Sequence, residues 1–351
     1  MNTATHLKRL RVHRALMTLL VLTVGVTNGA WGQSTPAPSD TALIALGQQL
    51  FQDPRLSADG TIRCASCHRP DKAYADGRRV AVGVYGRAST RNTPSLASIG
   101  RSGDTSFFWD GRRPTLEQAV LDPFINPVEM GLRDDRVLLS KLTADAAYFT
   151  AFAKRFPGTT TPITLIHVAA ALSAYIRSLD QRTSAYDRYR SQHDLSTLSA
   201  QAQQGLIIFS GKGECAQCHQ PNGSPVALTD HAYHRTGVGL GAVEQNLPAL
   251  TQDVIERSLQ GTDIGNRVAT HADESQLGRF NVTRNPADIG MFRTPSLRGV
   301  ALTAPYMHDG SVPTLDEAID REVYYRSLQA GRPLNLTVRE KQELRAFLEA
   351  L

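Results

Sequence analysis

The chain has 351 residues, of which 41% are hydrophobic and 20% are charged, and this composition excludes a disordered chain, a collagen-like repeat and a protein with many membrane spans. The length predicts two domains with buried cores. The formal net charge is +5, but four basic residues precede the first acidic residue, Asp40, so the rest of the chain carries +5 − 4 = +1. A nearly neutral protein has no electrostatic basis for binding phosphates, and we expect no nucleic acid partner.

Residues 1–32 have the pattern of a secretory signal peptide. The four basic residues lie between positions 8 and 14, an apolar run follows over 15–26, and small residues at 30 and 32 mark the expected cleavage site. This apolar run is shorter than the ~20 residues needed to cross a membrane. We therefore expect export to the periplasm and no transmembrane anchor after cleavage.

Helical patterns recur along the rest of the chain, whereas strand patterns are sparse. The first predicted helix places five residues on one face: Leu43, Leu46, Gly47, Leu50 and Phe51. Similar patterns cover 162–179 and 198–209, the latter with Ser199 as the expected N-cap. The last helix is expected to begin at Thr337, with Glu340 completing a capping box. The polar stretch 180–198 predicts a boundary between domains 33–195 and 196–351.

The four cysteines form two motifs, CASCH at 64–68 and CAQCH at 215–219. Two thiols that add to one porphyrin, followed at once by a histidine that binds its iron, are the attachment pattern of c-type haem. Two disulfides, a redox dithiol or a zinc site are the alternatives, but none of them requires the adjacent histidines. We expect two covalently bound haems, held by Cys64, Cys67, His68, Cys215, Cys218 and His219.

The two halves share further segments in the same order. TPSL occurs at 93–96 and 294–297, and DGRRPTLEQAV at 110–120 matches DGSVPTLDEAI at 309–319. This repetition indicates duplication of one haem-binding unit and predicts a mainly α fold of two cytochrome c-like haem domains packed against each other. The repeat aligns Trp109 with His308. An indole at a domain junction either packs there or carries an electron between haems.

The first haem is expected to have an open face. Residues 69–129 contain neither histidine nor methionine, so no strong sixth ligand follows the first motif. His167, in the apolar helical segment, is interpreted as a buried structural residue. Peroxide chemistry at an open iron needs a group that moves protons, and Glu129 in the segment NPVEMG is the candidate. The alternative for Glu129 is a solvated surface carboxylate.

The chain resembles the bacterial di-haem cytochrome c peroxidase family, which includes the MauG-type enzymes. The resemblance covers nearly all of the chain after residue 32, through CASCH, RNTPSL, FFWDGR, EQA, NPVEMG, CAQCH, LTDHAYHRTGVG, TPSLRGVALTAPYMHDG and PTLDEAI. It implies that Glu129 is the acid/base group, with Gln118 beside it and Trp109 in the electron route. It also implies a calcium ion held by the Asn92 side chain and the carbonyls of Thr303 and Pro305.

Two positions depart from the family pattern. Peroxidases that need reductive activation carry a displaceable histidine before RNTPSL, where this chain has Val84, so the first haem is expected to react without activation. The sixth ligand of the second haem is Met in the peroxidases and Tyr in MauG-type enzymes. The aligned residue is Glu322, an unusual haem ligand. Tyr325, about one helical turn further, is favoured instead. Tyr324 and Met307 remain alternatives.

The sequence thus predicts a periplasmic peroxidase that reduces hydrogen peroxide at the first haem. Electrons would come from a small redox protein, a cytochrome c or a copper protein, and pass from the second haem by way of Trp109. One alternative is a MauG-like oxidase that directs the same chemistry at a partner protein. The other is a di-haem electron carrier without catalytic activity.

Overall fold

The computed structural model describes residues 40–99, 103–179, 183–192, 195–223, 226–262 and 264–351. The signal peptide expected over 1–32 lies outside these residues. From Pro38 to Leu351 the chain forms one compact unit. Among the described residues, no helix combines the length and the apolar character that a membrane span requires.

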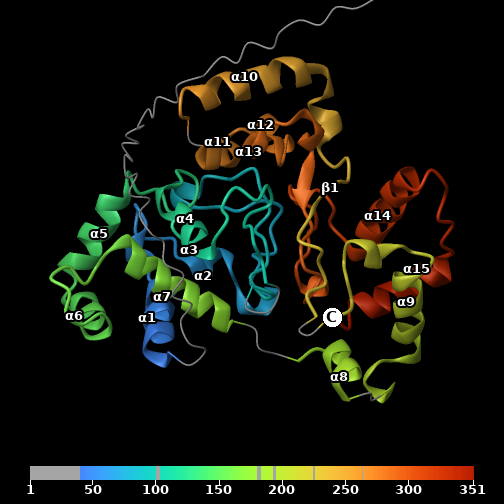
Figure 1. Cartoon of the computed structure of the whole chain (residues 1–351), viewed down its shortest axis with the longest axis horizontal. Coiled ribbons are helices and arrows are strands. Elements are labelled where there is room, and N and C mark those ends of the chain that lie inside the picture. The colour runs from blue at the N-terminus through green and yellow to red at the C-terminus, as the bar shows by residue number, and fades with distance from the viewer. Residues whose placement is uncertain (1–39, 100–102, 180–182, 193–194, 224–225, 263) are drawn as a thin grey trace, which may run out of the picture. The chain divides into compact units, whose positions relative to one another are not determined.

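Helices dominate the regular structure, which confirms the mainly α prediction (Figure 1). The helices preceding the second motif are α1 (Thr41–Gln52), α2 (Cys64–Cys67), α3 (Leu116–Ala119), α4 (Asp122–Ile125), α5 (Asp135–Ala144), α6 (Ala146–Arg155), α7 (Leu165–Ser178), α8 (Ala185–Gln192) and α9 (Ala200–Ser210). Those that follow it are α10 (Leu247–Leu259), α11 (Ile264–Thr270), α12 (Ala272–Gln276), α13 (Phe280–Thr283), α14 (Leu315–Gln329) and α15 (Val338–Leu348). Strands β1 (Tyr233–Arg235) and β2 (Met291–Arg293) pair antiparallel, with His234 opposite Phe292.

The first predicted helix is α1, and all five residues of its expected apolar face are buried. Asp40 caps it by accepting a hydrogen bond from the Leu43 backbone N–H at 2.9 Å. The buried face packs against α7 (Figure 1). At the crossing, a Cβ atom on Gly47 would lie 1.9 Å from the Ala171 carbonyl oxygen. Only glycine therefore allows the two helices to approach so closely.

An equivalent helix pair, α9 and α15, lies in the second half of the chain (Figure 1). Ser199 caps α9 as predicted. Thr337 and Glu340 form the predicted capping box of α15. At this crossing, a Cβ atom on Gly205 would lie 2.0 Å from the Glu343 carbonyl oxygen. Each half of the sequence thus builds a helix pair around a glycine, as a duplicated unit should.

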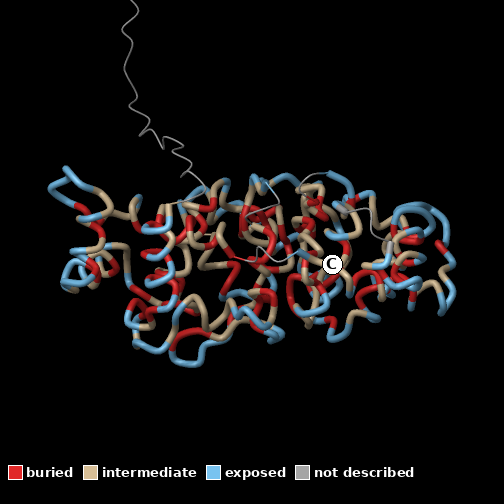
Figure 2. The backbone as a smooth tube through the Cα atoms, turned by 90° about the horizontal axis from the view of Figure 1, so that it is seen from below, coloured by how far each residue is buried: buried red, intermediate tan, exposed pale blue. Residues whose placement is uncertain are grey.

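The buried side chains form one large cluster from residues 43–179 and another from residues 186–351. Figure 2 shows the buried backbone, in red, running through the interior. Helix α8 packs with the second cluster, because Tyr186 is buried there and its hydroxyl donates to the Pro221 carbonyl at 3.1 Å. This helix precedes the boundary expected at 195/196. The division into two haem domains itself stays a prediction.

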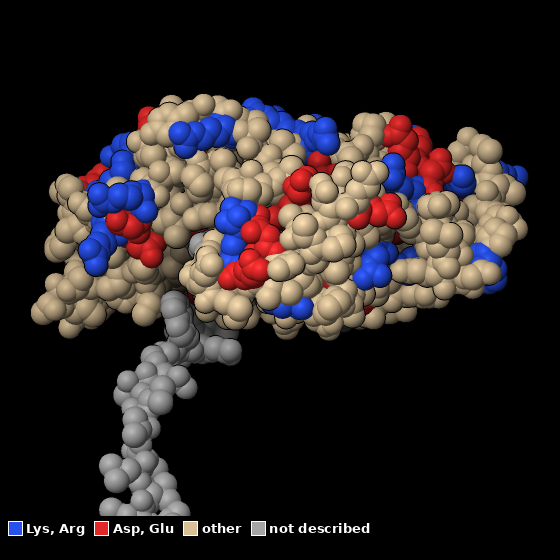
Figure 3. Space-filling model, turned by 90° about the horizontal axis from the view of Figure 1, so that it is seen from above, with Lys and Arg blue, Asp and Glu red and all other residues tan. Residues whose placement is uncertain are grey.

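Charged side chains of both signs share the face of the molecule shown in Figure 3. Lys and Arg are interspersed there with Asp and Glu. This arrangement fits the nearly balanced charge of the chain after its basic N-terminal segment.

Candidate haem-binding sites

The first motif places its histidine at the C-terminal end of α2. The His68 Nδ1 atom lies 2.8 Å from the Tyr74 carbonyl oxygen. Because a carbonyl can only accept, Nδ1 carries the proton and Nε2 has a free lone pair for a metal. Burial lowers the pKa of His68, although the bond to Tyr74 acts against this. The imidazole is therefore neutral, as an iron ligand must be.

The second motif repeats this arrangement. His219 follows a 3₁₀ turn over Cys215–Gln217, and its Nδ1 lies 3.1 Å from the Leu228 carbonyl oxygen. Burial lowers the pKa of His219 to about 4. Both motif histidines thus present Nε2 as the available ligand atom.

All four cysteines are free thiols. Burial raises the pKa of Cys64, Cys67 and Cys215 to about 12, whereas a redox dithiol needs a lowered pKa. Among the described residues, the cluster with metal-ligand spacing is Cys218, Asp230 and His234, which takes one cysteine from one motif and does not resemble a zinc site built on either pair. The thiols fit attachment to haem better than any of the alternatives.

Glu129 lies close to the first motif, since its charge raises the pKa of both Cys64 and Cys67. Its Oε1 accepts a hydrogen bond from the Asn126 side-chain amide at 3.0 Å. Burial raises the pKa of Glu129 to about 7, against the lowering effect of Arg112. A carboxyl group that titrates near neutral pH can both take up and release a proton, and the acid/base role of Glu129 stays a prediction.

The segment that carries Glu129 is held by a close backbone approach. A Cβ atom on Gly83 would lie 2.2 Å from the Val128 carbonyl oxygen and 2.4 Å from that of Glu129. The next residue, Val84, donates its backbone N–H to the Glu129 carbonyl at 2.9 Å and is fully buried. Val84 stands where some relatives are expected to carry a displaceable histidine. Here that position supplies an apolar side chain and a backbone bond.

Gln118 lies on α3, whose first turn is capped by Thr115. The Gln118 Oε1 atom is buried and makes no hydrogen bond within the described part of the chain. An unpaired buried acceptor indicates that a further group completes the site. Together with the thiols and His68, this orphaned atom makes the first site fit a haem.

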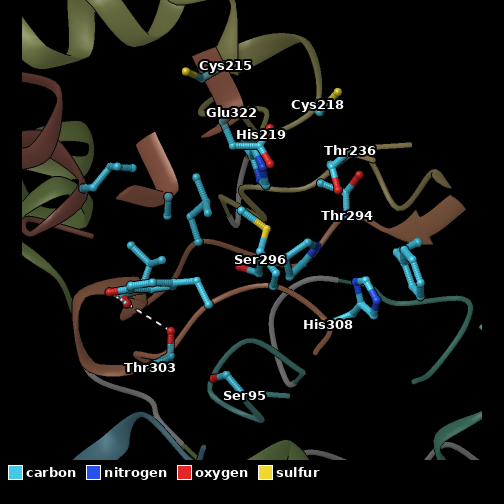
Figure 4. A pocket seen from close by; sticks show the side chains of 18 of the residues that line it. Ser95, Cys215, Cys218, His219, Thr236, Thr294, Ser296, Thr303, His308 and Glu322 are labelled. Atoms are coloured by element: carbon cyan, nitrogen blue, oxygen red, sulfur yellow. Dashed lines mark hydrogen bonds between the residues drawn. The ribbon is translucent and has the colours of Figure 1, made fainter. Parts of the chain in front are cut away.

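The second motif opens onto a cavity of about 230 Å³. Its lining includes Cys215, Cys218, His219 and Glu322 from the second half of the chain (Figure 4). The first half contributes Trp109 and residues 92–95. The Thr93 hydroxyl in this wall is buried and makes no hydrogen bond to any described residue. The two thiols, the His219 imidazole and this unpaired hydroxyl together fit a second haem.

The cavity distinguishes among the candidate sixth ligands of the second haem. Glu322 and Met307 both line it, and Glu322 extends from α14 into the same space as His219 (Figure 4). Burial raises the pKa of Glu322. Tyr325 is not among the lining residues; a Cβ atom on Gly237 would lie 2.5 Å from its ring, which shows how closely the two pack. Tyr324 is 59% exposed.

Trp109 belongs to the first half of the chain and reaches the second cavity. Its indole Nε1 donates to the Asn92 carbonyl at 2.8 Å, and its own carbonyl accepts the Arg293 backbone N–H at 2.8 Å. Its repeat partner, His308, is buried in the same wall, where its ring stacks on Phe292 at 3.6 Å between centroids. The indole is thus held beside the second motif, and its role in an electron route stays a prediction.

Backbone oxygens converge on the side chain of Asn92. Its Nδ2 lies 2.9 Å from the Arg78 carbonyl oxygen, 3.4 Å from that of Arg79 and 3.3 Å from that of Pro305. In this orientation the amide N–H groups of Asn92 face the carbonyls, and a cation at this place would need the Oδ1 atom turned toward it. Carbonyl and amide oxygens are the ligands that calcium prefers, and the donors around Asn92 fit that ion.

His167 is half-buried, less enclosed than the buried residue expected, and its contacts are of a structural kind. Its Nδ1 bonds to the Pro162 carbonyl at 2.7 Å, and its ring stacks on Phe156 at 3.7 Å between centroids.

Sequence reasoning did not single out Asn126, which orients Glu129, or Arg112, which lowers the pKa of Glu129. Both lie in motifs that had been noted, NPVEMG and FFWDGR, and their polarity beside a candidate acid was the available signal.

Comparisons with known proteins agree with this arrangement. A family model described as di-haem cytochrome c peroxidase matches residues 41–195, and one described as RoxA-like, cytochrome c-like matches residues 291–325. The methylamine utilization protein MauG of Methylorubrum extorquens is 33% identical over 328 residues, which cover 91% of this chain and 82% of that protein. Cytochrome-c peroxidase IdrP1 of Denitromonas iodatirespirans is 35% identical over 338 residues, with 90% and 84% covered.

Solved structures show the same similarity. A MauG-like protein associated with microbial copper homeostasis superposes with a TM-score of 0.70 and 33% identity, over 92% of this chain and 95% of that one. The diheme peroxidase BthA from Burkholderia thailandensis gives a TM-score of 0.67 and 25% identity, over 91% and 89%.

Proposed function

Because the chain belongs to the di-haem cytochrome c peroxidase and MauG family, we propose that it is a periplasmic peroxidase that reduces hydrogen peroxide with electrons from a small redox protein. The observation that carries this proposal is Glu129, a partly buried carboxyl group with a pKa of about 7 beside a haem motif that no histidine or methionine follows before residue 130. The overall change is H₂O₂ + 2 e⁻ + 2 H⁺ → 2 H₂O. Residues 33–195 would form the peroxidatic domain and residues 196–351 the electron-transfer domain.

In the first site, Cys64 and Cys67 would hold the haem, and the Nε2 atom of His68 would bind its iron. When bound, this haem supplies the redox centre at which peroxide is reduced. Glu129 takes a proton from one peroxide oxygen and delivers it to the other, and Asn126 keeps its Oε1 in place at 3.0 Å. The apolar Val84 would offer no ligand atom to the iron.

In the second site, Cys215 and Cys218 would hold the haem, and the Nε2 atom of His219 would bind its iron. Glu322, which lines the cavity, would be a further iron ligand in preference to Tyr325, which does not line it. Trp109 stands in the wall of this cavity and would carry electrons toward the first site. A calcium ion held by Asn92 and the carbonyls of Thr303 and Pro305 would fix the same wall.

A second candidate function is a MauG-like oxidase that acts on a partner protein. The oxygen donor at Glu322 favours it, since an anionic oxygen ligand stabilises oxidised iron more than a methionine sulfur does. Relatives of both kinds resemble this chain to a similar degree.

The test uses the haem-loaded protein with hydrogen peroxide and reduced cytochrome c. The proposal expects a high-spin ferric signal from one haem and steady peroxide-dependent oxidation of the cytochrome. Peroxide consumption that gives a long-lived oxidised protein, but no turnover with cytochrome c or a copper protein, would replace the peroxidase with the oxidase. Two six-coordinate low-spin haems that do not react with peroxide would leave only an electron carrier.

A further inference from the structure

The two TPSL segments form matching hydrogen bonds. In the first, the Ser95 hydroxyl donates to the Ala73 carbonyl at 2.5 Å and accepts the Ala97 backbone N–H at 3.1 Å. In the second, the Ser296 hydroxyl donates to the Ala227 carbonyl at 2.8 Å and accepts the Arg298 backbone N–H at 3.3 Å. Each serine thus clamps the end of its own TPSL turn to a loop that follows the haem motif of the same half.

The clamped carbonyl lies next to the one that orients the motif histidine. Ala73 directly precedes Tyr74, whose carbonyl accepts from His68 at 2.8 Å. Ala227 directly precedes Leu228, whose carbonyl accepts from His219 at 3.1 Å. In both halves, therefore, the serine hydroxyl and the motif histidine donate hydrogen bonds to the carbonyl groups of two consecutive residues.

The residues that face the histidines have unfavourable backbone conformations. Tyr74 has φ 59° and Leu228 has φ 55°, the left-handed region that side chains larger than glycine rarely adopt. Such residues persist only where neighbouring contacts hold them. The serine hydroxyl supplies a contact of this kind immediately beside each strained residue.

We propose that Ser95 and Ser296 are positioning residues that set the reduction potentials of the two haems, one serine for each haem. Each hydroxyl fixes the loop carbonyl that receives the Nδ1–H of the iron-binding histidine. A firm bond at Nδ1 makes the imidazole a stronger electron donor, which stabilises ferric iron. The inference rests on haem binding at both motifs, and it does not depend on which reaction the protein catalyses.

The test is a spectroelectrochemical titration of each haem in the haem-loaded protein. Ser95→Ala is expected to raise the potential of the first haem more than that of the second, because its hydroxyl bonds to the loop of His68 although residue 95 also lines the second cavity. Ser296→Ala is expected to raise the potential of the second haem alone. The expected shift is about tenfold in the ferric-to-ferrous ratio, or ~59 mV for one electron. The control is Ser173→Ala on α7, where the serine is buried and its hydroxyl has no hydrogen-bond partner among the described residues. Neither potential should move in this control.

Two further substitutions at each serine distinguish the effect of the hydroxyl group from the effect of side-chain volume. Ser95→Thr and Ser296→Thr retain the donor and should keep the parent potentials, whereas Ser95→Val and Ser296→Val should reproduce the alanine shifts. Unchanged potentials in correctly loaded alanine and valine variants would overturn the proposal, as would equal shifts of both haems from one substitution. Peroxide turnover is measured separately, so loss of the proposed peroxidase activity would not imitate either result.

Discussion

The two haem motifs share the contacts of their histidines and differ in the glutamate that lies near each. Each motif histidine donates Nδ1–H to a carbonyl of a left-handed residue, and each TPSL serine clamps the preceding residue. Each site also has a glutamate whose charge raises the pKa of a motif cysteine, Glu129 in the first and Glu322 in the second. These glutamates come from different structures: Glu129 from a loop after α4, and Glu322 from the long helix α14.

This difference shows how one duplicated unit can serve two purposes. The arrangement that anchors the histidine was retained, since both haems need the same attachment. Under the proposed function the two glutamates have different roles: Glu129 would move protons at the first haem, and Glu322 would bind the iron of the second. The following predictions test this division.

The largest effect is expected at the acid/base group. Glu129→Gln removes the proton acceptor and keeps the shape of the side chain, so peroxide turnover should fall about 10²- to 10⁴-fold. Steady-state kinetics of the haem-loaded variant would measure this. The control, Glu256→Gln on exposed α10, should retain full turnover. Full activity of the Glu129 variant with both haems bound would remove Glu129 from the proton path.

The loop that carries Glu129 depends on a contact with Gly83. A methyl group there would lie 2.2 Å from the Val128 carbonyl oxygen, so Gly83→Ala should destabilise the protein by about 1–3 kcal/mol and lower peroxide turnover. Thermal unfolding and kinetics would test both effects. Gly241→Ala is the matched control, because a Cβ atom at Gly241 meets no other atom within 4 Å. Equal stability of the two variants would contradict this account of the loop.

The second site should respond to Glu322 and not to Tyr325. Glu322→Ala should change the spectrum of the second haem and shift its ferric-to-ferrous ratio about tenfold or more, since it would remove the oxygen proposed to bind the iron. Tyr325→Phe should leave the spectrum unchanged, because the ring lies outside the cavity lining. Electron paramagnetic resonance of the ferric protein would record the spectra of both variants, and a redox titration would give the ferric-to-ferrous ratio. The reverse pattern would restore the tyrosine predicted from sequence.

The smallest effect concerns pH. Glu129 must be deprotonated to accept a proton from peroxide, so the reaction should rise with pH and reach half its maximum near pH 7. Arg112 lowers the pKa of Glu129, and Arg112→Gln should therefore move the midpoint to higher pH, by about one unit. Arg112→Lys keeps the charge and should keep the midpoint. A midpoint unchanged by Arg112→Gln would exclude Arg112 as its source.

Much of the local structure followed from the sequence. The buried face of α1, the Ser199 cap and the Thr337 capping box were all predicted, because each depends on residues within one or two helical turns. The choice between Glu322 and Tyr325 shows the limit of what the sequence could predict. Spacing on a helix places Glu322 and Tyr325 less than one turn apart, and only the packing of α14 against Gly237 determines which of them lines the cavity.

The sequence by itself determined where haem can be attached, since covalent attachment needs two thiols and a histidine within five consecutive residues. It also revealed the duplication, because repeated segments are visible without any structure. The tertiary structure decided which side chains surround each motif. The partners of Glu129, Trp109 and the two TPSL serines lie on other segments of the chain, and an acidity or a potential arises only when folding brings those segments into contact.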